Sequence, residues 1–256
     1  MSWALRFLGV GNAQAAPVLG SAAGVLERDG EPLLMIDCGQ EALSAFLDRY
    51  GAPPRAIYIT HTHMDHVGGL ERLFYKIYFD ARLRGQVRLY AHAAIVPLLQ
   101  NRIGDYPEVI AEGGANFWDA FTLVPLSRGF WHRGVWFDVF ETRHHAPGTS
   151  FGIRLAGSFV WTGDTRPIPE ALAQQASRGE LVAHDCALVG NPSHTGVDDL
   201  DREYREELRR QLVLYHYASN ADGDELARRG YRVARQGDVV ALAAPPARVT
   251  EQEAIG

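Results

Sequence analysis

The sequence predicts an α/β fold in which two β-sheets pack face to face and helices cover their outer surfaces. Short apolar strands alternate with helical segments along the 256 residues, a pattern typical of layered α/β domains. Hydrophobic side chains make up 46% of the chain, enough for a substantial core. Because no repeat or Ser/Gly linker interrupts the chain, we expect one domain over residues 1–244 and a tail over residues 245–256.

The first sixty residues predict a meander, then a helix and a buried strand. Asp29 and Gly30 form a hairpin signal between two strand-like segments. Apolar residues between Gln40 and Tyr50 recur at helical spacing, and Gly51 ends the helix. The expected elements are strands 5–9, 24–27 and 33–36, a helix over Gln40–Tyr50 and a strand over Ala56–Thr60.

Strands and helices keep alternating through the rest of the chain. The segments Phe121–Leu126 and Val135–Arg143 are expected to pair as neighbouring strands. Strand packing explains the aromatic residues between positions 117 and 140 better than a substrate-covering loop does. The Gly- and acid-rich stretch 104–116 is expected to be a loop. The other predicted elements are strands 86–91, 159–162, 181–184, 212–217 and 239–242, and helices ending at Gln100 and covering 169–177, 198–210 and 222–229.

Charge and cysteine content exclude several classes of protein. A net charge of −6 argues against a broad basic surface for nucleic acid. Two cysteines, Cys38 and Cys186, cannot build a disulfide framework. The N-terminus lacks the pattern of a secretion signal, and no apolar run approaches the roughly 20 residues that span a bilayer. We therefore expect a cytoplasmic protein without membrane contact, and a homodimer stays open.

Four residues that ligate first-row metals follow the strand Ala56–Thr60 within six positions. They are His61, His63, Asp65 and His66, and imidazole with carboxylate suits zinc, manganese and iron alike. As the chain leaves the strand, His61 and His63 can point the same way, whereas Asp65 and His66 begin a helix. One ion cannot use all four comfortably, so the sequence predicts two divalent metal ions.

The pattern HxHxDH after a hydrophobic strand resembles the signature of the metallo-β-lactamase superfamily, whose fold is an αββα four-layer sandwich. The resemblance extends over essentially the whole chain. Residues Phe7–Gly11 are similar to the glycine turn after the first strand, and Ile36–Gly39 to the aspartate-glycine turn beneath the metals. It implies that Asp37 orients a ligand imidazole; the alternative is a turn-capping aspartate.

The resemblance also implies three further ligands. Asp164 looks like the aspartate that bridges both ions, and His216 looks like the last histidine ligand. The mid-chain ligand is one of two adjacent histidines, and the distance to Ser150 favours His145, one residue farther away than in related enzymes. His144 is then a neighbouring pocket or structural residue. The implied metal set is His61, His63, Asp65, His66, His145, Asp164 and His216.

A second pair of residues indicates the branch of the superfamily. Asp185 follows a strand and His194 precedes a helix, which resembles the tRNase Z-like and phosphonate-pathway cyclic phosphodiesterase families. The resemblance implies that Asp185 holds His194, and that His194 protonates the leaving oxygen or binds a phosphoryl oxygen. The alternative is a surface histidine beside a helix-capping Thr195.

The predicted activity is hydrolysis of a small phosphodiester, such as a cyclic nucleotide or a cyclic sugar phosphate, by a hydroxide shared between two cations. Asp65 could also accept the proton of the water, although a metal ligand is a poor free base. Only Ala156–Ser158 stands where tRNA-processing enzymes carry a long arm, so nucleic acid is not the expected substrate. The alternatives are a lactone or ester hydrolase and a nuclease acting on RNA or DNA ends.

Overall fold

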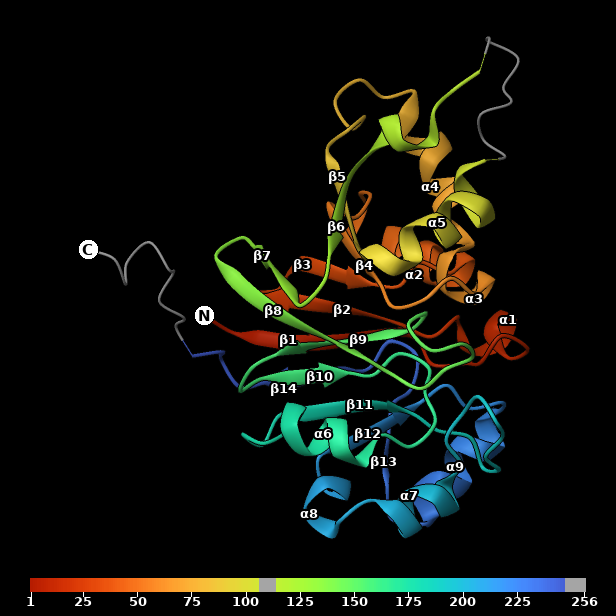
Figure 1. Ribbon diagram of the computed structural model, residues 1–256, viewed down its shortest axis with the longest axis vertical. Coiled ribbons are helices and arrows are strands. Elements are labelled where there is room, and N and C mark those ends of the chain that lie inside the picture. Colours follow the sequence, from red (N-terminus) through yellow and green to blue (C-terminus); the bar gives the residue numbers. More distant parts are fainter. Residues whose placement is uncertain (106–113, 247–256) are drawn as a thin grey trace.

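The structure, a computed structural model, describes residues 1–105 and 114–246. Within them two mixed sheets stack face to face, with helices α2–α5 on one side and α6–α9 on the other (Figure 1). The predicted α/β four-layer sandwich is confirmed. The first sheet has the order β14 (Val239–Leu242), β1 (Trp3–Gly9), β2 (Ala23–Arg28), β3 (Glu31–Ile36), β4 (Ala56–Ile59), β5 (Val87–His92) and β6 (Phe121–Leu126).

The second sheet lies against the first, and its strands come from the later part of the chain, between Gly129 and Val233. Its order is β13 (Arg232–Val233), β12 (Leu212–Tyr215), β11 (Leu181–Asp185), β10 (Phe159–Trp161), β9 (Phe151–Leu155), β8 (Val135–Glu141) and β7 (Gly129–His132). Strands β3 to β6 run parallel to one another, and so do strands β10 to β13. The carboxyl ends of these strands therefore meet at one edge of the sandwich.

The hairpin between β2 and β3 forms at the predicted turn. Arg28 pairs with Glu31 across it, and Asp29 and Gly30 have φ angles of 55° and 82°. Two consecutive positive φ angles match the right-handed twist of the strands, which is why aspartate and glycine are favoured there.

The predicted pairing of segments 121–126 and 135–143 is wrong. Strand β6 pairs with β5 in the first sheet, whereas β8 pairs with β7 and β9 in the second. A tight turn at Arg133 and Gly134, with φ angles of 47° and 77°, makes β7 and β8 the hairpin. Only residues 127 and 128 separate β6 from β7, so the chain changes sheets there.

The helices follow the predicted apolar spacing, with one difference. Helix α2 (Gln40–Tyr50) has its predicted bounds and ends at Gly51 with φ 69°. The helix expected over 198–210 is divided into α7 (Val197–Glu203) and α8 (Glu206–Arg209), because Tyr204 turns into the core and its hydroxyl contacts the Ile168 amide. The others are α1 (Ala16–Leu19), α3 (Met64–Val67), α4 (Gly69–Tyr78), α5 (Val96–Leu99), α6 (Pro169–Gln175) and α9 (Asn220–Arg228).

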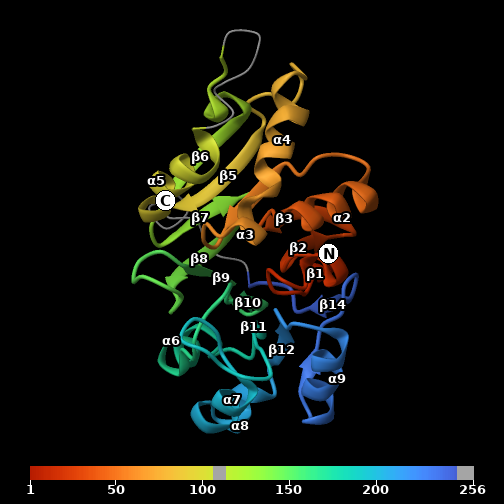
Figure 2. The ribbon, with the colours of Figure 1, turned by 90° about the vertical axis from the view of Figure 1, so that its right-hand side faces the viewer.

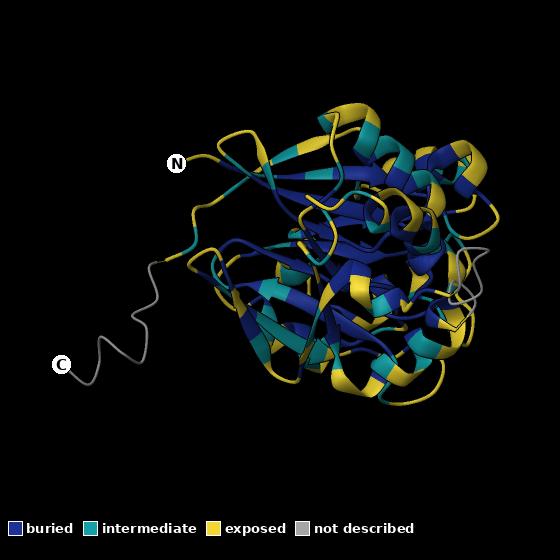
Figure 3. Ribbon diagram, turned by 90° about the horizontal axis from the view of Figure 1, so that it is seen from above, coloured by how far each residue is buried: buried dark blue, intermediate teal, exposed yellow. Residues whose placement is uncertain are grey.

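Two apolar clusters hold these layers together. One lies between the sheets and continues to helices α6, α7 and α9, and the other lies between the first sheet and helices α2 and α4. Viewed from above, the strands are buried and the outer helix faces exposed (Figure 3). Phe117, Phe121, Phe130 and Phe137 are buried in these clusters, so the aromatic segment packs as predicted. In the described residues no helix is long and apolar enough to cross a membrane.

Two predicted segments fall mainly outside the described residues. The loop 104–116 includes residues 106–113, and the tail 245–256 includes residues 247–256. The division into a 1–244 domain and a tail stays a prediction.

Candidate metal centre

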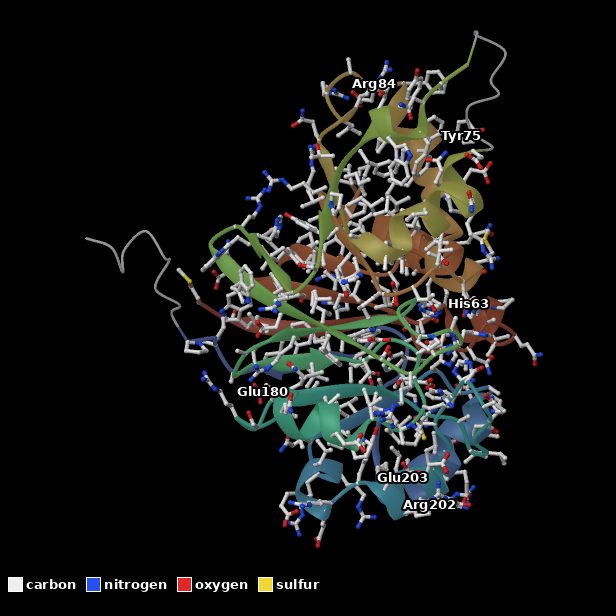
Figure 4. All side chains as sticks on the ribbon, viewed as in Figure 1. His63, Tyr75, Arg84, Glu180, Arg202 and Glu203 are labelled. Atoms are coloured by element: carbon white, nitrogen blue, oxygen red, sulfur yellow. The ribbon has the colours of Figure 1, made fainter. Side chains whose placement is uncertain are left out.

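The histidine-rich loop leaves β4 at the edge where the parallel strands end. Thr60 directly follows the last residue of β4. His63 directly precedes α3 and has an extended backbone. Figure 4 labels His63 at the right-hand end of the sandwich, and Figure 2 views the molecule from that side. His61 and His66 are buried, and His63 is half-buried. The loop therefore turns several imidazoles into one crowded space.

A first ligand cluster, formed by His61, His63, His144 and Asp164, gathers four ligand atoms within 4.8 Å of one another. His63 Nδ1 lies 3.1 Å from His61 Nε2 and 3.1 Å from His144 Nε2. Asp164 Oδ2 lies 3.7 Å from His61 Nε2 and 3.9 Å from His144 Nε2. Three imidazoles and one carboxylate at this spacing suit a first-row metal.

The mid-chain member of this cluster is His144, and the choice of His145 is corrected. His144 is 2% exposed and its Nδ1 donates to the Ser193 carbonyl at 2.9 Å, which leaves Nε2 free to bind a metal. His145 is exposed. Its φ of 52° reverses the chain after His144, so the two side chains point to different surroundings.

A second ligand cluster, formed by Asp65, His66, Asp164 and His216, lies beside the first and shares Asp164. Asp164 Oδ2 lies 3.3 Å from His66 Nε2 and 3.1 Å from His216 Nε2. Asp65 Oδ2 lies 3.5 Å from His66 Nε2 and 3.8 Å from His216 Nε2. Because one carboxylate reaches both clusters, Asp164 has the geometry of a bridging ligand.

Asp37 lies beneath both clusters and is fully buried. His66 Nδ1 donates to its Oδ2 at 2.8 Å, and the Thr60 hydroxyl donates to the same oxygen at 2.8 Å. The Thr60 oxygen in turn lies 3.0 Å from His61 Nδ1. One carboxylate thus orients a histidine of each cluster, directly for His66 and through Thr60 for His61.

Asp185 and His194 meet at the same edge. His194 Nδ1 lies 2.8 Å from Asp185 Oδ2, which also accepts the Thr165 amide at 2.9 Å. Asp185 Oδ1 lies 3.3 Å from His216 Nδ1. The His194 ring stacks on the His216 ring, with centroids 4.8 Å apart and planes at 19°. His194 therefore stands against the ligands with its Nε2 turned away from Asp185.

The pKa shifts of the histidines have opposite directions in the two ligand clusters. Burial lowers the pKa of His61 well below its ordinary value and that of His63 to about 4. Burial opposes protonation of His66 and His216 too, but the charge of Asp164, with Asp37 or Asp185, raises both pKa values well above the ordinary one. The carboxylates around the second cluster thus favour a positive charge, which a divalent cation also supplies.

The residues present fit a pair of divalent ions. His66 Nε2, His216 Nε2 and Asp164 Oδ1 are buried without a hydrogen-bond partner among the described atoms, a costly arrangement unless something binds them. Each cluster joins imidazole nitrogens to carboxylate oxygens, a donor set for zinc, manganese or iron. All predicted ligands except His145 come together here.

Comparison with known proteins identifies the family of this chain. A family model described as anti-Pycsar protein Apyc1 matches residues 3–240. The chain belongs to this family. An anti-Pycsar protein Apyc1 from Saccharibacillus brassicae is 31% identical over 226 residues, which cover 85% of this chain and 91% of that protein.

Solved structures share the fold of this Apyc1-family chain. A diphosphatase from the PhnP family aligns with a TM-score of 0.74 at 20% identity, covering 94% of this chain and 97% of that one. The short form of human tRNase Z aligns with a TM-score of 0.65 at 17% identity, covering 95% and 99%. These alignments confirm the predicted metallo-β-lactamase fold. With its metal-ligand clusters, this Apyc1-family protein is a metal-dependent hydrolase.

Sequence analysis missed two contributors to the centre of this Apyc1-family protein. Thr60 and the Ser193 carbonyl orient ligand imidazoles. Thr60 carries a weak signal, since it directly precedes His61. Nothing near Ser193 in the sequence signals its contact with a residue 49 positions away.

Proposed function

We propose that the protein is a dinuclear phosphodiesterase of a small phosphodiester, with a cyclic nucleotide as the substrate. The observation that carries this proposal is the Asp185–His194 pair, 2.8 Å apart, against the shared carboxylate of two ligand clusters. A phosphodiester with an alkoxide leaving group needs a proton donor, which lactone hydrolysis does not require to the same degree.

The chain's own residues have distinct parts in this proposal. Asp185 accepts from His194 Nδ1 and fixes the imidazole, so that Nε2 is the atom that gives a proton to the departing oxygen. Asp37 and Thr60 hold two ligand rings in place. Two bound divalent cations would supply Lewis acidity, which activates water and offsets charge on the phosphoryl oxygens.

Asp65 acts as a ligand in this proposal and not as the base. Burial favours its neutral form, but the charge of His66 and the polar contact with His216, whose Nε2 lies 3.8 Å from Asp65 Oδ2, outweigh burial and hold the pKa of Asp65 far below its ordinary value. A carboxylate with so low a pKa is a weak proton acceptor.

The connection between β9 and β10 favours a small substrate. These strands are paired antiparallel through the three-residue turn Ala156–Ser158, with Gly157 at φ 72°. No arm that could grip a tRNA is inserted at this turn. The family's name, anti-Pycsar protein, and the absence of excess basic charge are consistent with a small nucleotide as the target.

The test measures 3′,5′-cyclic nucleotide hydrolysis by zinc- and manganese-loaded protein, with a lactone and a precursor tRNA as competing substrates. In His194→Ala we expect both metals to stay bound, while cyclic nucleotide turnover falls by about 10²- to 10⁴-fold. Hydrolysis of a p-nitrophenyl phosphodiester should fall less, because that leaving group needs little protonation. Equal losses would assign His194 to phosphate binding, and efficient lactone or tRNA cleavage in place of cyclic nucleotide hydrolysis would contradict the proposal.

A further inference from the structure

The connection from β11 to α7 carries His194 and continues into a buried threonine. Asn191 and His194 pair through both of their backbone amides, at 3.1 and 3.3 Å, and the four residues of this turn are exposed or half-buried. Thr195, the next residue, is fully buried. The turn that presents His194 therefore has its buried anchor directly beside that histidine.

The Thr195 side chain does not cap helix α7. The N-cap of that helix is Gly196, whose amide donates to Asp199 at 2.9 Å. The Thr195 hydroxyl instead donates to the Thr165 carbonyl at 2.7 Å, and the Thr195 amide donates to the same oxygen at 2.9 Å. Thr195 is therefore not the helix cap that the sequence offers as an alternative.

Thr165 joins this anchor to the carboxylate that holds His194. It directly follows Asp164, the residue shared by both ligand clusters. Its amide donates to Asp185 Oδ2 at 2.9 Å, and the same oxygen lies 2.8 Å from His194 Nδ1. A closed ring of contacts results, in which only the link between His194 and Thr195 is covalent. Its members are Asp185, His194, Thr195 and Thr165.

This ring sets where His194 stands relative to the clusters. His194 Nδ1 lies 4.0 Å from Asp164 Oδ2, and the His194 side chain is 21% exposed. The other three members of the ring are fully buried, so their hydrogen bonds form in an interior of low dielectric, where they are stronger. A catalytic group must be held within about 0.5 Å of its productive place. The buried part of the ring supplies the rigidity that the partly exposed imidazole lacks.

Thr165 is a fixed reference for the ring. Its hydroxyl accepts the Arg143 amide at 3.1 Å and donates to the Arg166 carbonyl at 2.7 Å. These contacts, together with the one to Asp185, do not depend on Thr195. Loss of the Thr195 hydroxyl therefore loosens the turn that carries His194 and leaves the segment after β10 in place.

We infer that Thr195 is a positioning residue, which holds His194 in place against the shared carboxylate through the Thr165 carbonyl. The inference rests on the proposed function, because it concerns the proton donor of that reaction. Thr195 acts only through His194 and binds neither metal nor substrate. Its hydroxyl therefore matters for a leaving group that needs a proton and not for one that leaves without it.

The test removes the hydroxyl in Thr195→Val, which keeps the branched shape of the side chain. This variant should lower kcat for 3′,5′-cyclic nucleotide hydrolysis about tenfold, because a small displacement of a catalytic group is costly. KM and metal content should not change, and kcat for bis(p-nitrophenyl) phosphate should change little. Thr122→Val is the control, since the exposed Thr122 hydroxyl donates to the Gly85 carbonyl at 2.6 Å near the start of β6. It should leave both activities unchanged.

Two conservative variants keep the test readable if Thr195→Val does not fold. Thr195→Ser retains the hydroxyl and should regain most of the lost kcat, whereas Thr195→Cys offers only the weak donor of a thiol. For the cyclic nucleotide, kcat should decrease in the order wild type, Thr195→Ser, Thr195→Cys. Equal kcat in these three proteins contradicts the inference.

A double variant separates this inference from the proposed function. Thr195→Val added to His194→Ala should cause no further loss of kcat, because both changes act on the same proton donor. A further loss in the double variant, equal losses of both substrates in Thr195→Val, or wild-type kcat in Thr195→Val overturns the positioning role alone. Absence of any cyclic nucleotide hydrolysis by the wild-type protein overturns the proposed function and the positioning role with it.

Discussion

The two ligand clusters share Asp164 but differ in the groups that contact the second ring nitrogen of their histidines. In the first, His144 is held by a backbone carbonyl and His61 by the Thr60 hydroxyl. In the second, His66 is held by Asp37 and His216 faces Asp185. The second cluster also has a carboxylate of its own, Asp65.

This difference bears on how tightly each cluster would hold an ion. A carboxylate behind an imidazole makes the ligand more basic and fixes its orientation, and each added carboxylate ligand offsets one charge of the cation. The second cluster has both advantages, whereas the first has one shared carboxylate and the half-buried His63. We therefore expect the first cluster to lose its ion first when a chelator is added.

The largest expected effect follows removal of His144. His144→Ala takes one of four ligand atoms from the first cluster, so metal analysis should show about one ion per chain in place of about two. His145→Gly is the matched control and should retain both ions. If His145→Gly loses the ion and His144→Ala does not, the assignment of the mid-chain ligand made from the structure is wrong.

A smaller effect is expected from Asp37→Asn. Asparagine can still accept the Thr60 amide but cannot supply the carboxylate that holds His66, so affinity at the second cluster should fall about 10- to 100-fold. Competition with a coloured chelator measures this loss. Asp48→Asn, at an exposed position on α2, serves as the control, and equal chelator competition by both variants would remove Asp37 from metal binding.

The smallest effect concerns His132, a buried histidine that, unlike His66, faces no carboxylate. It contacts the Tyr90 hydroxyl at 2.9 Å and the Leu33 carbonyl at 3.1 Å, and burial lowers its pKa to about 4. The unfolded chain binds a proton at this residue below about pH 6.5, while the folded chain does so only near pH 4. Stability is therefore lost as the pH falls through this window.

Urea unfolding at pH 7 and pH 5 measures this contribution. His132→Gln should lose about 1–2 kcal/mol less stability between the two pH values than the wild type does. The comparison between variants cancels any loss of metal that both share. Identical losses would mean that folding does not lower the pKa of His132.

The candidate site was predictable where its residues are close in sequence. His61, His63, Asp65 and His66 fall within six positions, and a strand before them and a helix after them leave few ways to arrange the side chains. Asp164 and His216 were identified from resemblance, and the structure brings both to the same edge. The choice between His144 and His145 failed because spacing to Ser150 does not determine the φ of a loop residue.

The sequence by itself determined the layers, the strand-turn-ligand order and the presence of a metal-binding loop, because apolar periodicity and turn residues act over a few positions. Only the tertiary structure decided which sheet β6 and β8 join and which histidine faces the centre. It also decided that Asp37 and Asp185 each serve more than one imidazole. These outcomes depend on contacts between residues far apart in the chain, whose geometry no local pattern encodes.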